Sequence, residues 1–141
     1  MELQKLKDLA RETGFDAAGV APVALLSDEV AILRRWIEAG KNAGMEYMAR
    51  NLDKRENPAL LVEGAKSVIV TLTNYYTARK QVVGIPRIAK YAWGRDYHSV
   101  LKERLWHLLG ELQKTEDVTG RCFVDSAPVL EHEWARRAGL G

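Results

Sequence analysis

Hydrophobic residues recur at helical spacing in four stretches of the chain. The clearest stretch follows Asp96, which can cap a helix by accepting a backbone N–H bond. Its apolar stripe has a period of about 3.6 residues and consists of leucines: Leu101, Leu105, Leu108, Leu109 and Leu112. Other patterns predict helices over about residues 2–13, from a Ser27 cap to Gly40, and over residues 129–138.

Three shorter stretches predict β-strands. Residues 15–21 are small and apolar, and residues 67–73 form a β-branched run, apolar on both faces, which is typical of a central strand covered on both sides. Residues 121–124 predict a third strand, followed by a turn at 125–128. Because helices alternate with strands, the pattern favours an α+β (α/β layered) domain with its sheet covered by helices.

The segments between these elements are less regular. Residues 41–56 have no clean period and predict an irregular segment with local helical turns, and Asn57-Pro58 predicts the start of a short helix. Residues 77–86 carry basic residues, a glycine and a proline without periodicity, and predict an exposed loop.

Composition narrows the class of protein. The 141 residues are 47% hydrophobic and 28% charged, with a formal net charge of +2, which fits one globular domain and falls short of a dedicated nucleic-acid module. No apolar run has the roughly 20 residues of a membrane span, and no signal peptide is recognisable, so we expect a cytoplasmic protein. The single cysteine, Cys122, cannot build a disulfide or a four-cysteine cluster. Since the chain stops just past the last predicted helix, we expect a fragment of a longer polypeptide.

Asp125 is the first candidate for chemistry. It follows an apolar stretch, and partial desolvation there would suit a proton donor near neutral pH. The alternative is that Asp125 or Ser126 caps the helix that begins near Pro128. Caps far outnumber catalytic acids, so the spacing alone favours capping.

Two further clusters have mixed polar and aromatic character. Residues 90–98, Lys-Tyr-Ala-Trp-Gly-Arg-Asp-Tyr-His, could line a pocket for a large planar ligand or a nucleobase. From the pattern alone we slightly favour the alternative, a helix entry in which Tyr91 and Trp93 fill the core and Asp96 caps. Residues 50–58 offer the guanidinium groups of Arg50 and Arg55 to carboxylate, phosphate or amide groups, although most charge runs are solvated surface.

At these three clusters the chain resembles the epoxyqueuosine reductase family. The matching residues are 51–58, 90–98 and 124–141, in the family's order and spacing, and the resemblance covers nearly the whole chain. It implies an enzyme that uses cobalamin to reduce epoxyqueuosine to queuosine at the tRNA wobble position, either by cobalt attack on the epoxide or by electron transfer to it. It also implies a nitroreductase-like, cobalamin-trafficking-type fold, with residues 1–141 as an amino-terminal cobalamin-binding catalytic domain.

The resemblance assigns roles to individual residues. Asp125 matches the proposed proton donor and Arg55 a cobalamin-contacting arginine, while the backbone of Ala89 approaches the cofactor and Tyr91 and Tyr97 line its pocket. The family's two [4Fe-4S] clusters belong to a cysteine-rich segment absent here, and no metal ligand is expected in this chain. The implied partners are tRNA carrying epoxyqueuosine and an external electron donor, and we expect a monomer.

Two other functions compete with this one. The chain could be a noncatalytic cobalamin-binding domain, or a tRNA-binding module with steep salt dependence and no bound corrinoid. The latter would use the basic residues of the chain: Arg34, Arg35, Arg50, Lys54, Arg55, Arg79, Lys80 and Arg87.

Overall fold

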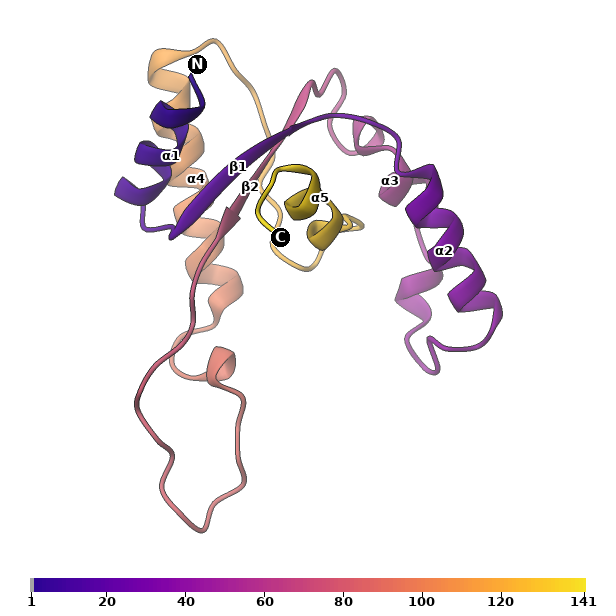
Figure 1. The fold of residues 1–141 in the computed structure, drawn as a ribbon, viewed down its shortest axis with the longest axis vertical. Helices are drawn as coiled ribbons and strands as arrows, with labels where there is room; N and C mark the ends of the chain where they lie inside the picture. The colour runs from indigo at the N-terminus through magenta and orange to yellow at the C-terminus, as the bar shows by residue number, and fades with distance from the viewer. Residues whose placement is uncertain (1) are drawn as a thin grey trace. The chain divides into compact units, whose positions relative to one another are not determined.

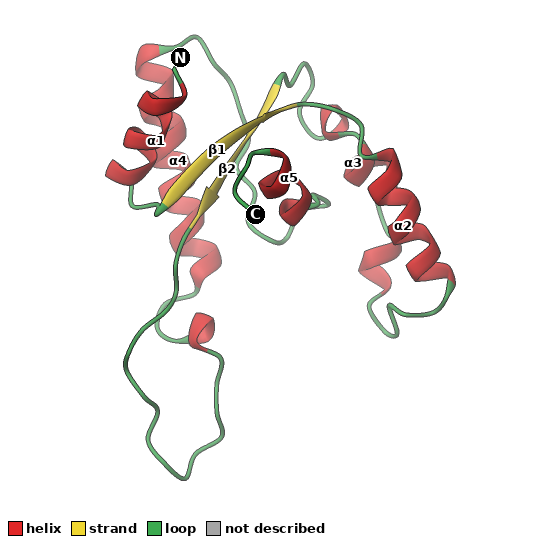
Figure 2. Ribbon diagram, viewed as in Figure 1, coloured by secondary structure: helices red, strands yellow, loops and turns green. Residues whose placement is uncertain are grey.

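The computed structural model describes residues 2–141, which form two compact units. Unit 1 contains the residues up to Ala18 together with 71–124, and unit 2 contains 19–70 together with 125–141. Two strands run through both units, β1 (Ala17–Pro22) and β2 (Ser67–Leu72), and pair in a two-stranded sheet (Figures 1 and 2).

The pairing of β1 with β2 is antiparallel. At one end the Asp16 N–H donates to the Leu72 carbonyl at 2.9 Å. At the other end the Val23 N–H donates to the Lys66 carbonyl at 3.0 Å. The two strands therefore run in opposite directions, and the chain that connects them belongs to unit 2.

Unit 1 packs two helices on the start of β1. Helix α1 (Leu3–Glu12) and helix α4 (Tyr97–Thr115) share a core with the strand, and a short 3₁₀ helix, η3 (Lys90–Ala92), precedes α4. The buried residues of this core are Leu6, Ala10, Phe15, Ala18, Leu108 and Leu112. The predicted Asp96 cap is confirmed, since its carboxylate accepts the backbone N–H of His98 at 2.9 Å.

Unit 2 contains the remaining helices. They are α2 (Ser27–Glu38), η1 (Glu46–Ala49), α3 (Leu52–Glu56), η2 (Pro58–Leu60) and α5 (Glu131–Arg137). Ala21, Leu26 and Trp134 are its buried core residues. At Gly19 the end of α5 approaches the strand so closely that a Cβ atom there would lie 2.5 Å from the Ala138 carbonyl oxygen. Glycine is required at this position because no side chain fits.

Most predicted elements are confirmed, including the four main helices, the first two strands, the irregular segment 41–56 and the loop at 77–86. Three predictions are wrong. Residues 121–124 form no strand, since only β1 and β2 form a sheet among residues 2–141. For the same reason β2 is not a central strand covered on both sides, and its residues alternate between half-buried and exposed over much of its length. Ser27 does not cap α2, because Leu26 holds that position and the Ser27 hydroxyl donates to Glu56 Oε1 at 2.6 Å.

The observed class is α+β, a small sheet with helices. Within residues 2–141 no helix is both long enough and apolar enough to cross a bilayer.

Candidate functional site

Asp125 lies in the turn that leads to α5. Its backbone is left-handed, with φ +53°, and its side chain is exposed. The prediction of a desolvated carboxyl after a buried strand is therefore wrong, because the preceding residues form no strand. The capping alternative is also wrong, since α5 begins at Glu131 with Leu130 as its N-cap and no side-chain cap bond.

Glu131 is the main contact that sequence reasoning missed. Its Oε1 atom accepts the backbone N–H of Asp125 at 2.9 Å. Burial raises the pKa of Glu131, and the neighbouring Asp125 charge raises it further, against the opposing effects of the Asp125 N–H and His132. A glutamate in the first turn of a helix is common, so nothing local in the sequence distinguished this one.

Arg55 lies on α3, where its guanidinium is half-buried. The Nε atom is buried and has no hydrogen-bond partner among the described residues. Burial lowers the pKa of Arg55, with Tyr47 opposing the shift. A buried unpaired donor costs free energy that a ligand acceptor would recover. This arrangement fits the predicted contact of Arg55 with the amide or phosphate oxygens of a cofactor.

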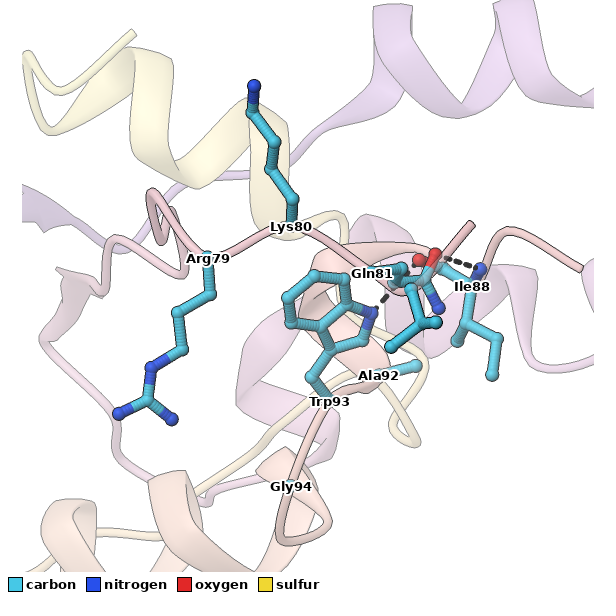
Figure 3. A pocket seen from close by; sticks show the side chains of 8 residues that line it. Arg79, Lys80, Gln81, Ile88, Ala92, Trp93 and Gly94 are labelled. Carbon is cyan, nitrogen blue, oxygen red and sulfur yellow. Dashed lines mark hydrogen bonds between the residues drawn. The ribbon is translucent and has the colours of Figure 1, made fainter. Parts of the chain in front are cut away.

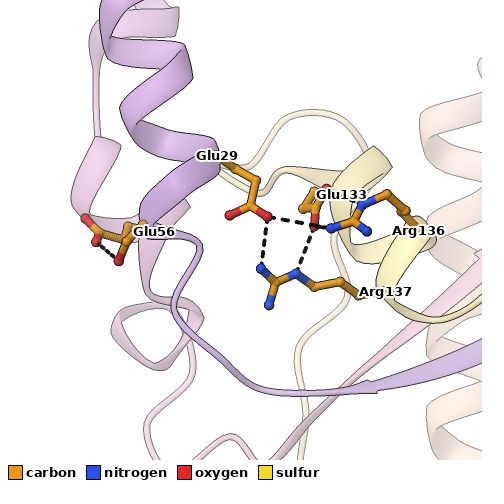
Figure 4. A network of polar contacts seen from close by, with 6 residues as sticks. Glu29, Glu56, Glu133, Arg136 and Arg137 are labelled. Atoms are coloured by element: carbon orange, nitrogen blue, oxygen red, sulfur yellow. Dashed lines mark hydrogen bonds and ion pairs between the residues drawn. The ribbon is translucent and has the colours of Figure 1, made fainter.

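Helix α5 is tied to α2 by a network of ion pairs (Figure 4). The Arg137 guanidinium lies 2.9 Å from Glu29 Oε1 and 2.8 Å from Glu133 Oε1. The Arg136 Nε–H donates to Glu133 Oε2 at 2.9 Å. Hydrogen bonds from Arg136 and then Arg137 lower the pKa of Glu133 to about 2, so its carboxylate stays charged well into acid. These ion pairs hold α5, the helix that begins at Glu131, against α2.

In unit 1 the predicted pocket residues belong to a row of aromatic rings. Tyr91 makes edge-to-face contacts with Tyr75 at 6.2 Å and with Tyr97 at 5.9 Å between centroids. The Tyr97 ring stacks on His98 at 4.1 Å. Tyr91 is 52% exposed, so the alternative in which it fills the core is wrong. Tyr75 was missed as a member of this row, although the adjacent Tyr75-Tyr76 pair at the end of a predicted strand was a usable signal.

A shallow pocket of about 460 Å³, widely open to solvent, lies between residues 79–82 and 88–94 (Figure 3). The indole of Trp93 lines it and donates from Nε1 to the Ile88 carbonyl at 3.0 Å. Gln81 Oε1 accepts the Ile88 N–H at 2.9 Å, and Arg79 and Lys80 are also lining residues. Of the predicted 90–98 cluster, Ala92, Trp93 and Gly94 therefore line an open hollow on the surface, and the tyrosines do not.

The structure distributes the predicted site residues over the two units. Unit 1 holds Tyr91 and Tyr97 in contact, with the exposed Ala89 just before η3, and unit 2 holds Arg55 and Asp125. Among residues 2–141 no group of three or more His, Cys, Asp or Glu side chains could hold a metal ion. One half-buried thiol, Cys122, does not fit a four-cysteine iron–sulfur cluster.

Comparison with known proteins identifies the family. The profile described as "Epoxyqueuosine reductase QueG, DUF1730" matches residues 55–126, about half of the chain. Epoxyqueuosine reductases from Leadbetterella byssophila and Cyclobacterium marinum are each 44% identical to it, covering 98% of this chain and 46% of their own length. The relative from Pseudomonas aeruginosa is 43% identical over 98% of this chain and 40% of its own length.

Solved structures agree with these relatives. The structure of epoxyqueuosine reductase from Streptococcus thermophilus superposes with a TM-score of 0.86 at 28% identity, covering all of this chain and 40% of that one. A crystal structure of epoxyqueuosine reductase with an epoxyqueuosine-modified tRNA-Tyr stem loop gives 0.82 at 28% identity, covering 98% of this chain and 38% of that one. The chain spans less than half the length of these relatives. It belongs to the epoxyqueuosine reductase family.

Proposed function

We propose that residues 1–141 are the amino-terminal, cobalamin-binding catalytic part of an epoxyqueuosine reductase, which reduces epoxyqueuosine to queuosine in tRNA. The observation that supports this most strongly is the 44% identity to relatives of that name along 98% of the chain. Reduction of the epoxide to an alkene consumes two electrons and two protons and releases the oxygen as water. Bound cobalamin would supply the redox chemistry, which no side chain of this chain can provide.

Asp125 is the proton donor in this proposal. The epoxide oxygen becomes a poor alkoxide leaving group as its C–O bond breaks, and a proton from the Asp125 carboxyl neutralises it. The exposed position of Asp125, in the turn before α5, supports the role because a bound nucleoside can reach the carboxyl from solvent.

Arg55 is the proposed polar contact for the cofactor, since its buried Nε–H lacks an acceptor among the described residues and corrin side chains offer amide and phosphate oxygens. Ala89, Tyr91 and Tyr97 are the proposed wall residues, and the exposed aromatic row supports this because flat rings pack well on a planar macrocycle. The fold in this proposal is of the nitroreductase-like, cobalamin-trafficking type.

The remaining components of the proposed enzyme lie outside this chain. We place two [4Fe-4S] clusters in the cysteine-rich segment, where they would pass electrons from an external donor. The complex of a relative with a modified tRNA stem loop supports tRNA as the substrate. We place the monomeric enzyme in the cytoplasm, where tRNA is modified.

The test uses the full-length protein with its iron–sulfur segment. Wild type should convert epoxyqueuosine to queuosine in tRNA, as measured by mass spectrometry of digested nucleosides, and Asp125→Ala should bind cobalamin normally but lose at least about 100-fold in turnover. Unchanged turnover would remove Asp125 from the mechanism. A wild type that binds cobalamin and reduces nothing would leave a noncatalytic binding domain.

Arg55 is tested by binding alone. Arg55→Lys keeps the charge but loses the Nε–H, and should weaken cobalamin binding about tenfold, or about 1.4 kcal/mol, in a visible-absorbance titration. Arg34→Lys, on the exposed face of α2, is the matched control and should bind as wild type does. Equal affinity in both variants would contradict the contact.

A further inference from the structure

The conformation of Asp125 needs support. Only three non-glycine residues among 2–141 have a positive φ, and Asp125 is one of them, at +53°. A left-handed backbone is unfavourable for residues other than glycine, although aspartate and asparagine adopt it more readily than the rest. The Asp125 N–H takes no part in α5, which begins only at Glu131, so its acceptor must be water or another group of the protein.

Glu131 supplies an acceptor from six residues further along the chain. Its Oε1 atom accepts the Asp125 N–H at 2.9 Å, which closes the turn. One glutamate therefore holds the backbone from which the Asp125 carboxyl projects, and a fixed backbone restricts where that carboxyl can lie.

The glutamate itself stands on a rigid element. Trp134, one turn later on α5, is only 2% exposed in the core of unit 2. Arg137 binds Glu29 on α2, and the end of α5 lies against Gly19 too closely for a Cβ atom. The helix that carries Glu131 is thus held by three contacts, whereas the turn that Glu131 holds is exposed.

We propose that Glu131 is a positioning residue for the catalytic acid: its carboxyl accepts the Asp125 N–H and so holds the turn from which the Asp125 carboxyl projects. This inference rests on the proposed function.

The bond does not depend on one protonation state of Glu131. Burial is the main cause that raises the pKa of Glu131, and the Asp125 N–H and His132 oppose it. Glu131 therefore keeps its proton to a higher pH than an ordinary glutamate, and both the charged and the neutral carboxyl have an oxygen that can accept the Asp125 N–H.

Three variants of the full-length enzyme test the proposal. Glu131→Ala removes the acceptor of the Asp125 N–H and should lower kcat about 10- to 100-fold, with KM for the tRNA and cobalamin binding unchanged. Glu131→Gln keeps an acceptor for the Asp125 N–H, so this near-isosteric variant should rescue kcat to within about threefold of wild type. Glu63→Gln, an exposed glutamate of unit 2, is the control and should match wild type in every measurement.

A double variant separates positioning of Asp125 from a general structural effect. If Glu131 acts through Asp125, then Asp125→Ala combined with Glu131→Ala should be no slower than Asp125→Ala alone. A further tenfold loss in the double variant would overturn the proposal. So would a Glu131→Ala enzyme with wild-type kcat, or a Glu131→Gln enzyme as slow as Glu131→Ala.

Failure of this inference is distinguishable from failure of the proposed function. If wild type reduces epoxyqueuosine and Asp125→Ala does not, unaffected Glu131 variants overturn only the role of Glu131. If wild type reduces nothing, or Asp125→Ala is fully active, the function or its acid fails first, and the inference fails with it. Should Glu131→Ala not fold, Glu131→Met, which is similar in size but has no oxygen to accept the Asp125 N–H, decides by the same loss of kcat relative to Glu131→Gln.

Discussion

The same chemical change at two glycines should have opposite effects on stability. A Cβ atom at Gly19 would lie 2.5 Å from the Ala138 carbonyl oxygen and 3.1 Å from Leu140 Cγ. Real contacts of this kind stay beyond 3.0 Å, so the end of α5 would have to move away by about half an ångström. Overpacking of this size costs about 1–3 kcal/mol.

Gly110 is the matched control because it lies inside α4, where a Cβ atom would meet nothing within 4 Å. Alanine in a helix interior is more favourable than glycine by about 0.5–1 kcal/mol, since it restricts the unfolded chain. Gly19→Ala should therefore lower, and Gly110→Ala raise, the free energy of unfolding.

Urea unfolding followed by circular dichroism measures both changes, and thermal unfolding should show them as shifts of about 4 °C per kcal/mol. A Gly19→Ala chain as stable as wild type would refute the close approach of α5 to β1. If both variants were destabilised, the open space around Gly110 would be refuted instead.

Three further outcomes are expected. Leu108→Ala, which empties part of the core of unit 1, should lower the free energy of unfolding by about 2–5 kcal/mol in urea. The pKa of Glu133 is depressed in the folded protein, so the charged carboxylate adds its full share to the free energy of unfolding above pH 4.5 and loses it as the pH falls toward about 2. The difference in urea midpoint between wild type and Glu133→Gln should therefore disappear as the pH falls from 4.5 to about 2. Burial raises the pKa of the Cys122 thiol, against a weaker opposing effect of Lys102. Alkylation of Cys122 by iodoacetamide should therefore need a higher pH than alkylation of a free cysteine. A rate faster than that of a free cysteine would contradict this environment.

Helices were predictable because their signals are local. The leucine stripe behind Asp96 and the cap itself lie within one segment, and α4 forms where they indicate. The strand predicted at residues 121–124 failed because β-propensity does not supply a neighbouring strand, and none of the described residues pairs with this segment. Ser27 failed for a related reason, since its hydroxyl binds Glu56 and not its own helix.

In the candidate site, too, local signals were predictable and contacts between distant residues were not. The resemblance singled out Asp125 and Arg55, but their surroundings depend on contacts between distant residues. The exposure of Asp125 and the bond from its N–H to Glu131 follow from where α5 begins, which spacing placed too early. The unpaired Nε of Arg55 depends on burial, and the contact of Tyr91 with Tyr75 joins the two ends of a long loop, so neither could be read from a local pattern.

Unit 2 has a consequence for synthesis on the ribosome. Its core joins Ala21 and Leu26 to Trp134, and the stretch that completes unit 1 is made in between. Residues 19–70 of unit 2 are therefore synthesised before the residues that complete their core, and their apolar side chains stay uncovered meanwhile. During that time residues 71–124 emerge, and α4 can pack on α1. Unit 1 can close first during translation, and ribosomes stalled before Trp134 emerges should present a nascent chain in which only unit 1 resists protease.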